Sequence, residues 1–225
     1  MDFQLKIKMN EKLFLRNPEE SELGKNIIKY GVTLIHKIGF EAFTFKKLAQ
    51  EIGTTEASIY RYFENKHRLL IYIVDWYWSW QEYRLVFETN NIKSPETKIK
   101  KAIQLLASKV EDDVATSYIN EKLVYDIVMY EGAKAYLTKQ VAEDNKLKLF
   151  KPYKDLCARI ADFIKDYNPK YKYPRSLSST MIEMAHSQKF YMQNLPSLTD
   201  FASSIDEAKI ISFLEGIVFS SIRKA

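Results

Sequence analysis

The sequence predicts an all-α fold, and three observations support this prediction. Glycine and proline number only 6 each among 225 residues, whereas a β-sandwich or barrel needs turn signals every ~8–12 residues. Hydrophobic residues make up 46% of the chain and aromatic residues 14%, which is enough apolar material for a packed core at this length. Apolar residues also recur three and four positions apart over long stretches, which is the period of an amphipathic helix.

Composition narrows the class of protein further. The 34 Lys and Arg residues against 29 Asp and Glu residues give a net charge of +5, which is mildly basic. The single cysteine, Cys157, cannot form an internal disulfide, and 3 histidines do not supply the usual zinc ligand sets. No stretch has the pattern of a signal peptide or reaches the ~20 apolar residues of a membrane span. We therefore expect a cytoplasmic protein with no membrane contact, no metal site and no cofactor.

The N-terminal region is predicted to begin with an arm and a first helix. Residues 1–20 are expected to form an arm, for which the sequence shows no packed role. A helix is expected from Ser21 to a break at Gly39, because apolar residues follow helical spacing between them. This stripe consists of Ile27, Ile28, Gly31, Leu34, Ile35 and Ile38.

Two short helices joined by a tight turn are predicted next. Thr44 is suited to cap the first of them, which covers FKKLAQEI and ends at Gly53. Thr54 or Thr55 can cap the second, which continues to about Tyr62. This spacing is typical of a helix-turn-helix, in which the second helix lies in the major groove of DNA. Two short helices joined by a glycine also occur in many all-α proteins, so a protein-interaction module is a second interpretation.

The rest of the chain is predicted to be helical as well, giving about nine helices in total. A long helix begins near Lys66 and carries an apolar stripe at helical spacing through Phe87. Breaker residues such as Pro95 and Pro169 separate the segments that follow. The expected helices there are ETKIKKAIQLLASKVEDD, EKLVYDIVMYEG, AKAYLTKQVAED, KPYKDLCARIADFIKDY, PRSLSSTMIEMAHSQKFYMQNL and DEAKIISFLEGIVFSSIRKA.

The stretch around the predicted helix-turn-helix carries a specific motif. Its elements are Gly39-Phe40, Thr44, Leu48-Ala49, Gly53, Ser58-Ile59-Tyr60, Tyr62-Phe63 and Asn65-Lys66. With these residues, the stretch IIKYGVTLIHKIGFEAFTFKKLAQEIGTTEASIYRYFENKHRLL resembles the N-terminal DNA-binding domain of the TetR/AcrR family of transcriptional regulators. The match fills nearly every position of the family pattern, but it covers only this part of the chain.

The resemblance implies a domain organisation and a set of DNA contacts. It implies a three-helix DNA-binding domain over residues 21–68, followed by a larger helical ligand-binding and dimerisation domain over residues 69–225. Glu56 departs from the family, in which many members carry Lys, Arg or Gln there, so Glu56 either accepts from a cytosine or points away. The residues that the resemblance places at DNA are Thr44, Lys46, Thr54, Thr55, Glu56, Ala57, Ser58, Tyr60, Tyr62 and Lys66.

Aromatic residues follow the predicted DNA-binding domain and allow two interpretations. Core packing is the first, because large aromatic side chains dominate protein cores. The second is a pocket for a small apolar or aromatic effector, since in this family the fourth helix connects the ligand pocket to the DNA-binding domain. The predicted ligand-binding residues are Trp80, Tyr83, Phe87, Tyr125, Met129, Phe163 and Tyr167, with Tyr130 beside them.

A second copy of the chain is another predicted partner. One short recognition helix contacts too few base pairs for specific affinity, so we expect a homodimer on a near-palindromic operator whose half-sites lie one helical turn, ~34–36 Å, apart. The last two predicted helices are suited to a four-helix interface. Its predicted residues are Met181, Met184, Phe190, Ile211, Leu214, Gly216 and Ile217, with Tyr191 and Phe219 beside them.

These expectations combine into one functional prediction. The chain is predicted to be a dimeric transcriptional repressor that binds double-stranded DNA and is released from it by an unknown small-molecule effector. The competing interpretation is a helical protein-interaction adaptor that keeps the head fold without specific DNA binding. No phosphate-binding glycine loop and no hydrolase or metalloprotease motif occurs in the sequence, so no catalytic residue is expected.

Overall fold

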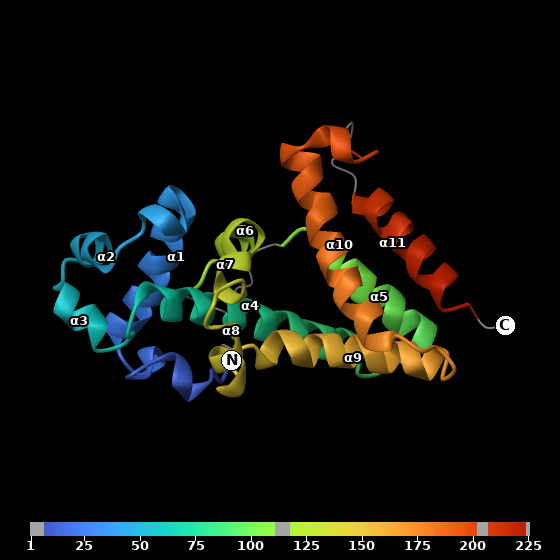
Figure 1. Ribbon diagram of the computed structural model, residues 1–225, viewed down its shortest axis with the longest axis horizontal. Helices are drawn as coiled ribbons and strands as arrows, with labels where there is room; N and C mark the ends of the chain where they lie inside the picture. Colours follow the sequence, from blue (N-terminus) through green and yellow to red (C-terminus); the bar gives the residue numbers. More distant parts are fainter. Residues whose placement is uncertain (1–6, 111–117, 202–206, 224–225) are drawn as a thin grey trace. The chain divides into compact units, whose positions relative to one another are not determined.

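The structure is a computed structural model that describes residues 7–110, 118–201 and 207–223 (Figure 1). These residues form α-helices and short 3-10 helices, and no strand occurs among them. The all-α prediction is therefore confirmed. None of the helices in the described part of the chain is long and apolar enough to cross a membrane.

The chain divides into two compact units, and one helix supplies residues to both. The first unit consists of Met1–Trp80 and Val110–Pro152, and the second of Gln81–Lys109 and Tyr153–Ala225. Helix α4 (Lys66–Thr89) begins in the first unit and ends in the second. The two units do not begin or end at the domain boundaries predicted after residues 20 and 68. Those boundaries stay a prediction.

Eleven α-helices occur in the described residues, more than the nine or so predicted. The segment 133–146 accounts for part of this difference, because it is interrupted at Leu137, where ψ is 58°. Besides α4, the first unit contains η1 (Glu11–Leu13), η2 (Pro18–Glu20), α1 (Glu22–Ala42), α2 (Phe45–Ile52), α3 (Glu56–Tyr60), α6 (Glu121–Glu131), α7 (Ala133–Tyr136) and α8 (Val141–Lys146). The second contains α5 (Pro95–Ala107), nearly all of α9 (Lys151–Tyr167), α10 (Pro174–Asn194), η3 (Pro196–Leu198) and α11 (Glu207–Ser221).

Helix α1 forms where the apolar stripe predicted it. Ser21 caps the helix, because its Oγ accepts a hydrogen bond from the backbone N–H of Gly24 at 3.1 Å. The stripe residues Ile27, Ile28, Gly31, Leu34 and Ile35 are buried. Gly39 has φ of 77° and ψ of 156°, so the regular helix breaks at the predicted residue, although helical turns continue to Ala42.

The N-terminal arm is packed against the first unit, a role that the sequence did not show. Met9, Leu13 and Pro18 are buried. The side-chain amide of Asn10 donates to the backbone oxygen of Leu147 at 3.0 Å, after α8. Apolar residues alternate with polar ones from Phe3 to Met9, but the residues that the arm contacts are distant in sequence. The sequence pattern therefore gave no sign of these contacts.

Helix α4 is buried on all sides from its second turn to Trp78. Every side chain from Leu69 to Trp78 is buried, so the predicted one-sided stripe describes only part of its packing. Aromatic rings make much of this core, and Trp76 stacks on Trp80 with ring centroids 6.3 Å apart. Asp75 lies in the middle of this segment with only 1% of its surface exposed. Its Oδ2 has no hydrogen-bond partner among the described residues.

In the second unit, three helices pack on one another around a separate core. α5, α10 and α11 are in mutual contact. Their buried residues include Ile103 from α5, Met181 and Ile182 from α10, and Leu214 from α11. The buried ammonium of Lys189 on α10 donates to the backbone oxygen of Ser108, the residue that caps α5, at 2.5 Å.

The buried Asp75 carboxyl generates a prediction about stability and pH. Burial raises its pKa from 3.8 to about 8, so between these values the folded chain holds a proton that the unfolded chain releases. The wild-type free energy of unfolding should therefore fall as pH rises from 4 to 8. Asp75→Asn should remove this decline and be more stable than the wild type by a few kcal/mol at pH 8, as measured by urea unfolding across that range.

The control for this comparison is Asp162→Asn on α9, where the carboxylate is exposed. This variant should keep the wild-type pH dependence. Parallel profiles for the wild type and Asp75→Asn would contradict the assignment of a protonated carboxyl at this position.

Candidate nucleic-acid interface

The two short helices and their turn form by local hydrogen bonding, as the sequence predicts. Thr44 Oγ1 accepts from the backbone N–H of Lys47 at 3.2 Å and caps α2. α2 ends at Gly53, which lies in the left-handed region with φ of 75° and ψ of 38°. Of the two candidate caps for the next helix, Thr55 is the one used, and its Oγ1 accepts from the N–H of Ser58 at 3.2 Å.

α3 is shorter than predicted and presents its first turn outward. It covers Glu56–Tyr60, whereas the sequence suggested a helix to about Tyr62. Ile59 and Phe63 are buried and hold this segment on the head, by which we mean α1, α2, α3 and the start of α4. The predicted base-reading residues lie on the accessible side: Thr55 and Ala57 are exposed, and Thr54, Glu56 and Ser58 are half-buried.

Exposed cations flank these two helices. Lys46, in the first turn of α2, and Arg61, directly after α3, are exposed and form no ion pair with any residue in the described ranges. The ammonium of the neighbouring Lys47 donates to the backbone oxygen of Ala42 at 2.8 Å. Tyr60 is 46% exposed and packs edge-on against Phe45, with ring centroids 5.0 Å apart. These positions suit phosphate contacts from two sides of α3.

Lys66 has a structural role in place of the predicted phosphate contact. Its ammonium donates to three backbone oxygens, those of Phe40 at 3.0 Å, Glu41 at 3.1 Å and Phe43 at 3.1 Å. An ammonium has three N–H donors, so all of them are used within the chain. The same group lies 4.7 Å from the centroid of the Phe40 ring. Lys66 thus ties the start of α4 to the end of α1.

The position of the Tyr62 side chain also differs from the one expected for a phosphate contact. Only 3% of its surface is exposed, and its hydroxyl is 2.7 Å from the Oγ of Ser21. The side chain is therefore directed into the head and joins the segment after α3 to the N-terminal cap of α1.

The part of the chain that contains these helices matches a known protein family. Residues 27–73 match the family described as bacterial regulatory proteins, tetR family. The match contains the buried face of α1, the whole helix-turn-helix and the first two turns of α4. This N-terminal part of the chain is therefore similar to the DNA-binding part of tetR-family regulators.

Solved structures of tetR-like fold extend the similarity to nearly the whole chain. A structure of AibR in complex with isovaleryl coenzyme A and operator DNA has a TM-score of 0.59 and 14% identity, covering 87% of this chain and 97% of AibR. A TetR/AcrR-family regulator from Thermobifida fusca has a TM-score of 0.57 and 15% identity, covering 88% and 97%. The superantigen PfiT has a TM-score of 0.59 and 14% identity, covering 92% and 98%. At such identities the likeness shows the fold alone. No curated protein sequence matches the chain.

Polar contacts tie the tetR-type head to α6 and α8 within the first unit. Arg68 at the start of α4 donates to the buried Asp144 of α8 at 2.7 Å. His36 on α1 lies 3.1 Å from the carboxylate of Asp126 on α6. Each pair joins residues that are far apart in sequence, so no local pattern could have indicated it. Two further contacts lie nearby. The N–H of Phe40 on α1 donates to Glu131 on α6 at 2.9 Å, and His67 on α4 lies 3.1 Å from the backbone oxygen of Lys134 on α7.

The predicted effector residues fall into two groups. Trp80, which is buried, and Tyr125 and Met129, which are half-buried, belong to the first unit. The others belong to the second unit: Phe163 is buried, Tyr167 is half-buried, and Tyr83 and Phe87 are exposed. Phe87 is 76% exposed and stacks on Tyr83 with ring centroids 6.4 Å apart. These two rings lie on the surface of the chain, so their assignment to an effector pocket stays a prediction.

Some of the predicted dimer residues are buried within the chain, and the others are half-buried or exposed. Met181 and Leu214 lie in the core formed by α5, α10 and α11, so their placement at an interface between copies is wrong. Gly216 is exposed, and a Cβ added to it would meet no atom within 4 Å. Four further predicted residues on α10 and α11 are half-buried: Met184, Phe190, Ile211 and Ile217.

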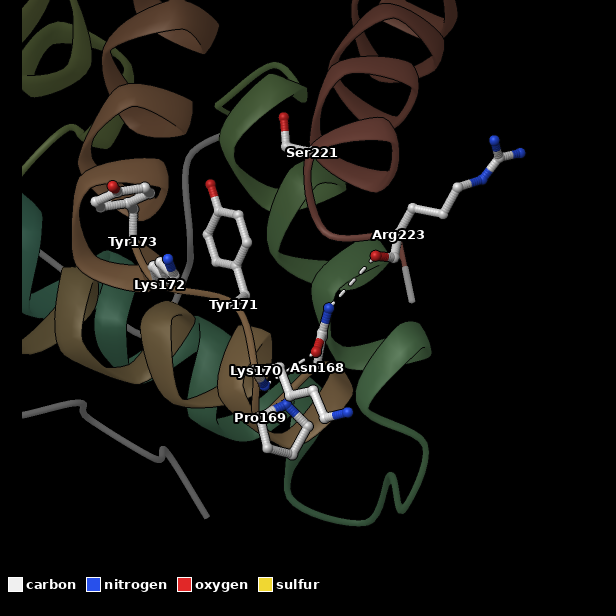
Figure 2. A pocket seen from close by; sticks show the side chains of 8 residues that line it. All are labelled: Asn168, Pro169, Lys170, Tyr171, Lys172, Tyr173, Ser221 and Arg223. Atoms are coloured by element: carbon white, nitrogen blue, oxygen red, sulfur yellow. Dashed lines mark hydrogen bonds between the residues drawn. The ribbon is translucent and has the colours of Figure 1, made fainter. Parts of the chain in front are cut away.

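A basic cleft lies between the loop after α9 and the end of α11, within the second unit. In Figure 2 the Tyr171 ring stands in the cleft, whereas the Arg223 side chain extends away from it. The side-chain amide of Asn168 bonds the backbone oxygen of Ile222 at 3.1 Å and closes one end. The lining contains none of the predicted effector residues and consists of Asn168, Pro169, Lys170, Tyr171, Lys172, Tyr173, Ser221 and Arg223.

Proposed function

We propose that the chain is a sequence-specific DNA-binding transcriptional regulator. The observation that carries this proposal is the outward face of α3, where the exposed Thr55 and Ala57 lie next to the unpaired cation of Arg61. Small and hydroxyl side chains on a helix allow close approach to base edges, while cations beside them bind phosphates. The match of residues 27–73 to the tetR family supports the proposal. So does the similar fold of AibR, which was crystallised with operator DNA. We place the regulator in the cytoplasm, where such DNA lies.

We further propose that the regulator acts as a homodimer and represses transcription. A five-residue recognition helix reads few base pairs, and two copies on adjacent half-sites supply the missing contacts. The half-buried side chains of α10 and α11, together with the open surface at Gly216, offer an apolar face for the second copy. Phe213, which is exposed on α11, extends this face.

An effector is proposed to release the regulator from DNA. We assign its contacts to Trp80, Tyr125 and Met129 in the first unit, where Tyr77 and Tyr125 already pack with ring centroids 6.2 Å apart. The ion pair between Arg68 and Asp144 joins the start of α4 to α8, so a displacement of these helices changes the support of the head. Acyl thioesters belong among the probes besides apolar and aromatic compounds, because AibR was crystallised with isovaleryl coenzyme A.

A protein-interaction adaptor is the second candidate function. The similarity to PfiT favours it, since that protein is a superantigen. Fold alone therefore does not decide between the two functions. We assign no reaction to the chain, because tetR-family proteins regulate by binding.

Binding to DNA from upstream of the chain's own gene tests the leading proposal. The full chain should shift this fragment, and its affinity should fall steeply between about 50 and 200 mM salt because phosphate contacts release counterions. Ala57→Glu should abolish selective binding, since a carboxylate on the outward face of α3 is repelled by DNA. Gel-shift titrations with competitor DNA measure both effects.

The matched control is Ala133→Glu, which adds the same charge at an exposed position of α7. It should bind like the wild type. Absence of selective binding to any genomic fragment, with a protein partner captured instead, would favour the adaptor.

Gly216 offers a separate test of the proposed dimer. Its Cβ position is open in the single chain, so Gly216→Arg should leave the fold intact but block close approach of a second α11. We expect the dimer dissociation constant to rise at least tenfold, as measured by sedimentation equilibrium. Gly216→Ala is the control and should dimerise like the wild type. A monomeric wild type at micromolar concentration, or an unaffected Gly216→Arg dimer, would contradict this interface.

A further inference from the structure

The N-terminal arm brings a cation to the end of α3. The backbone N–H of Leu15 donates to the backbone oxygen of Tyr62 at 2.8 Å. The guanidinium of the next residue, Arg16, lies over the Tyr62 ring, 5.4 Å from its centroid. Tyr62 comes two residues after the last residue of α3. Arg16 is therefore held beside the C-terminal end of the proposed recognition helix, although it is distant from that helix in sequence.

The arm is fixed on both sides of Arg16. Before it, Leu13 is buried in the first unit. After it, the buried Pro18 approaches α1 so closely that its backbone oxygen would lie 2.2 Å from a Cβ on Gly24. Glu19 accepts hydrogen bonds from the hydroxyls of Tyr72, at 3.0 Å, and Tyr118. A cation on such an anchored segment loses little backbone freedom when it binds a ligand.

Arg16 is available to an external anion. Its side chain is exposed, and it forms no ion pair with a carboxylate in the described part of the chain. Arg68 and Arg159, by contrast, are each paired with a carboxylate at 2.7 Å. The ring of Tyr62 supports the guanidinium by a cation–π contact without neutralising its charge.

We propose that Arg16 binds a DNA phosphate at the edge of the interface formed by α2 and α3. This inference rests on the proposed DNA-binding function. The resemblance to the TetR/AcrR family assigned a phosphate contact to position 62, but here the Tyr62 hydroxyl bonds Ser21 and its ring carries Arg16. The arm thus supplies the charge that position 62 does not. A guanidinium suits this role because its planar donors match phosphate oxygens.

Salt-dependent binding to a labelled mixed-sequence duplex tests this contact, since a phosphate contact does not depend on base sequence. Arg16→Gln in the full chain should weaken binding several-fold at low salt. The slope of log affinity against log salt should become shallower by about 0.9 per DNA-bound head, because one fewer counterion is released. Arg16→Lys keeps the charge and should retain most of the wild-type slope. Fluorescence anisotropy measures all three proteins.

Two controls separate this contact from other effects. Arg175→Gln removes the same charge at an exposed position of α10 in the second unit and should leave the slope unchanged. Arg61→Gln removes a cation beside α3 and should make the slope shallower. An unchanged slope for Arg16→Gln would overturn the arm contact and leave the proposed function standing. A wild type that shows no salt-dependent binding to DNA would overturn both.

Discussion

Three backbone oxygens at the end of α1 and in the turn after it converge on the ammonium of Lys66, and the placement of the helix-turn-helix depends on this convergence. The break at Gly39 frees carbonyl groups that a continuing helix would have bonded. Lys66 bonds these groups from the first residue of α4. The end of α1, the start of α2 and the start of α4 are thereby fixed to one another. α3 follows α2 with Thr55 and Ala57 exposed to solvent.

The local parts of the head were predictable because their signals lie within a few residues of each other. The caps at Thr44 and Thr55 and the left-handed Gly53 depend only on neighbouring backbone groups, and all three form as the pattern indicates. The roles of Tyr62 and Lys66 were not predictable from spacing. Each bonds a partner from another element, Ser21 in one case and the end of α1 in the other. Of the ten predicted DNA contacts, these two are therefore used inside the protein.

In the helices after the head, sequence patterns predict where a helix lies but not which of its apolar residues are buried. Helical period located α5, α9, α10 and α11, but it does not say which apolar residues face a neighbouring helix and which remain outside. Leu214 proved to be core, and Phe87 proved to be surface. Both are apolar residues at helical spacing, and only tertiary packing distinguishes them. The domain boundaries and the effector contacts stay predictions for the same reason.

α4 connects the head to the residues that we propose to bind an effector. It carries Lys66 and Arg68 at its start, and the enclosed aromatic segment with the buried Asp75 follows. A helix buried on all sides moves as a rigid element, because a core packed to crystal-like density resists local deformation. A change at Trp80 is thus able to reach the junction held by Lys66. This physical continuity is the basis of the proposed regulation by an effector.

The central claim is that two copies of α3 lie in successive major grooves of one DNA site. Hydroxyl-radical footprinting with methylation interference at guanine N7 tests this most directly, on a fragment selected from genomic DNA by the full chain. The account predicts two protected clusters centred about one helical turn, ~34–36 Å, apart, with interference in the major groove of each. A single protected cluster, or interference confined to the minor groove, would contradict it.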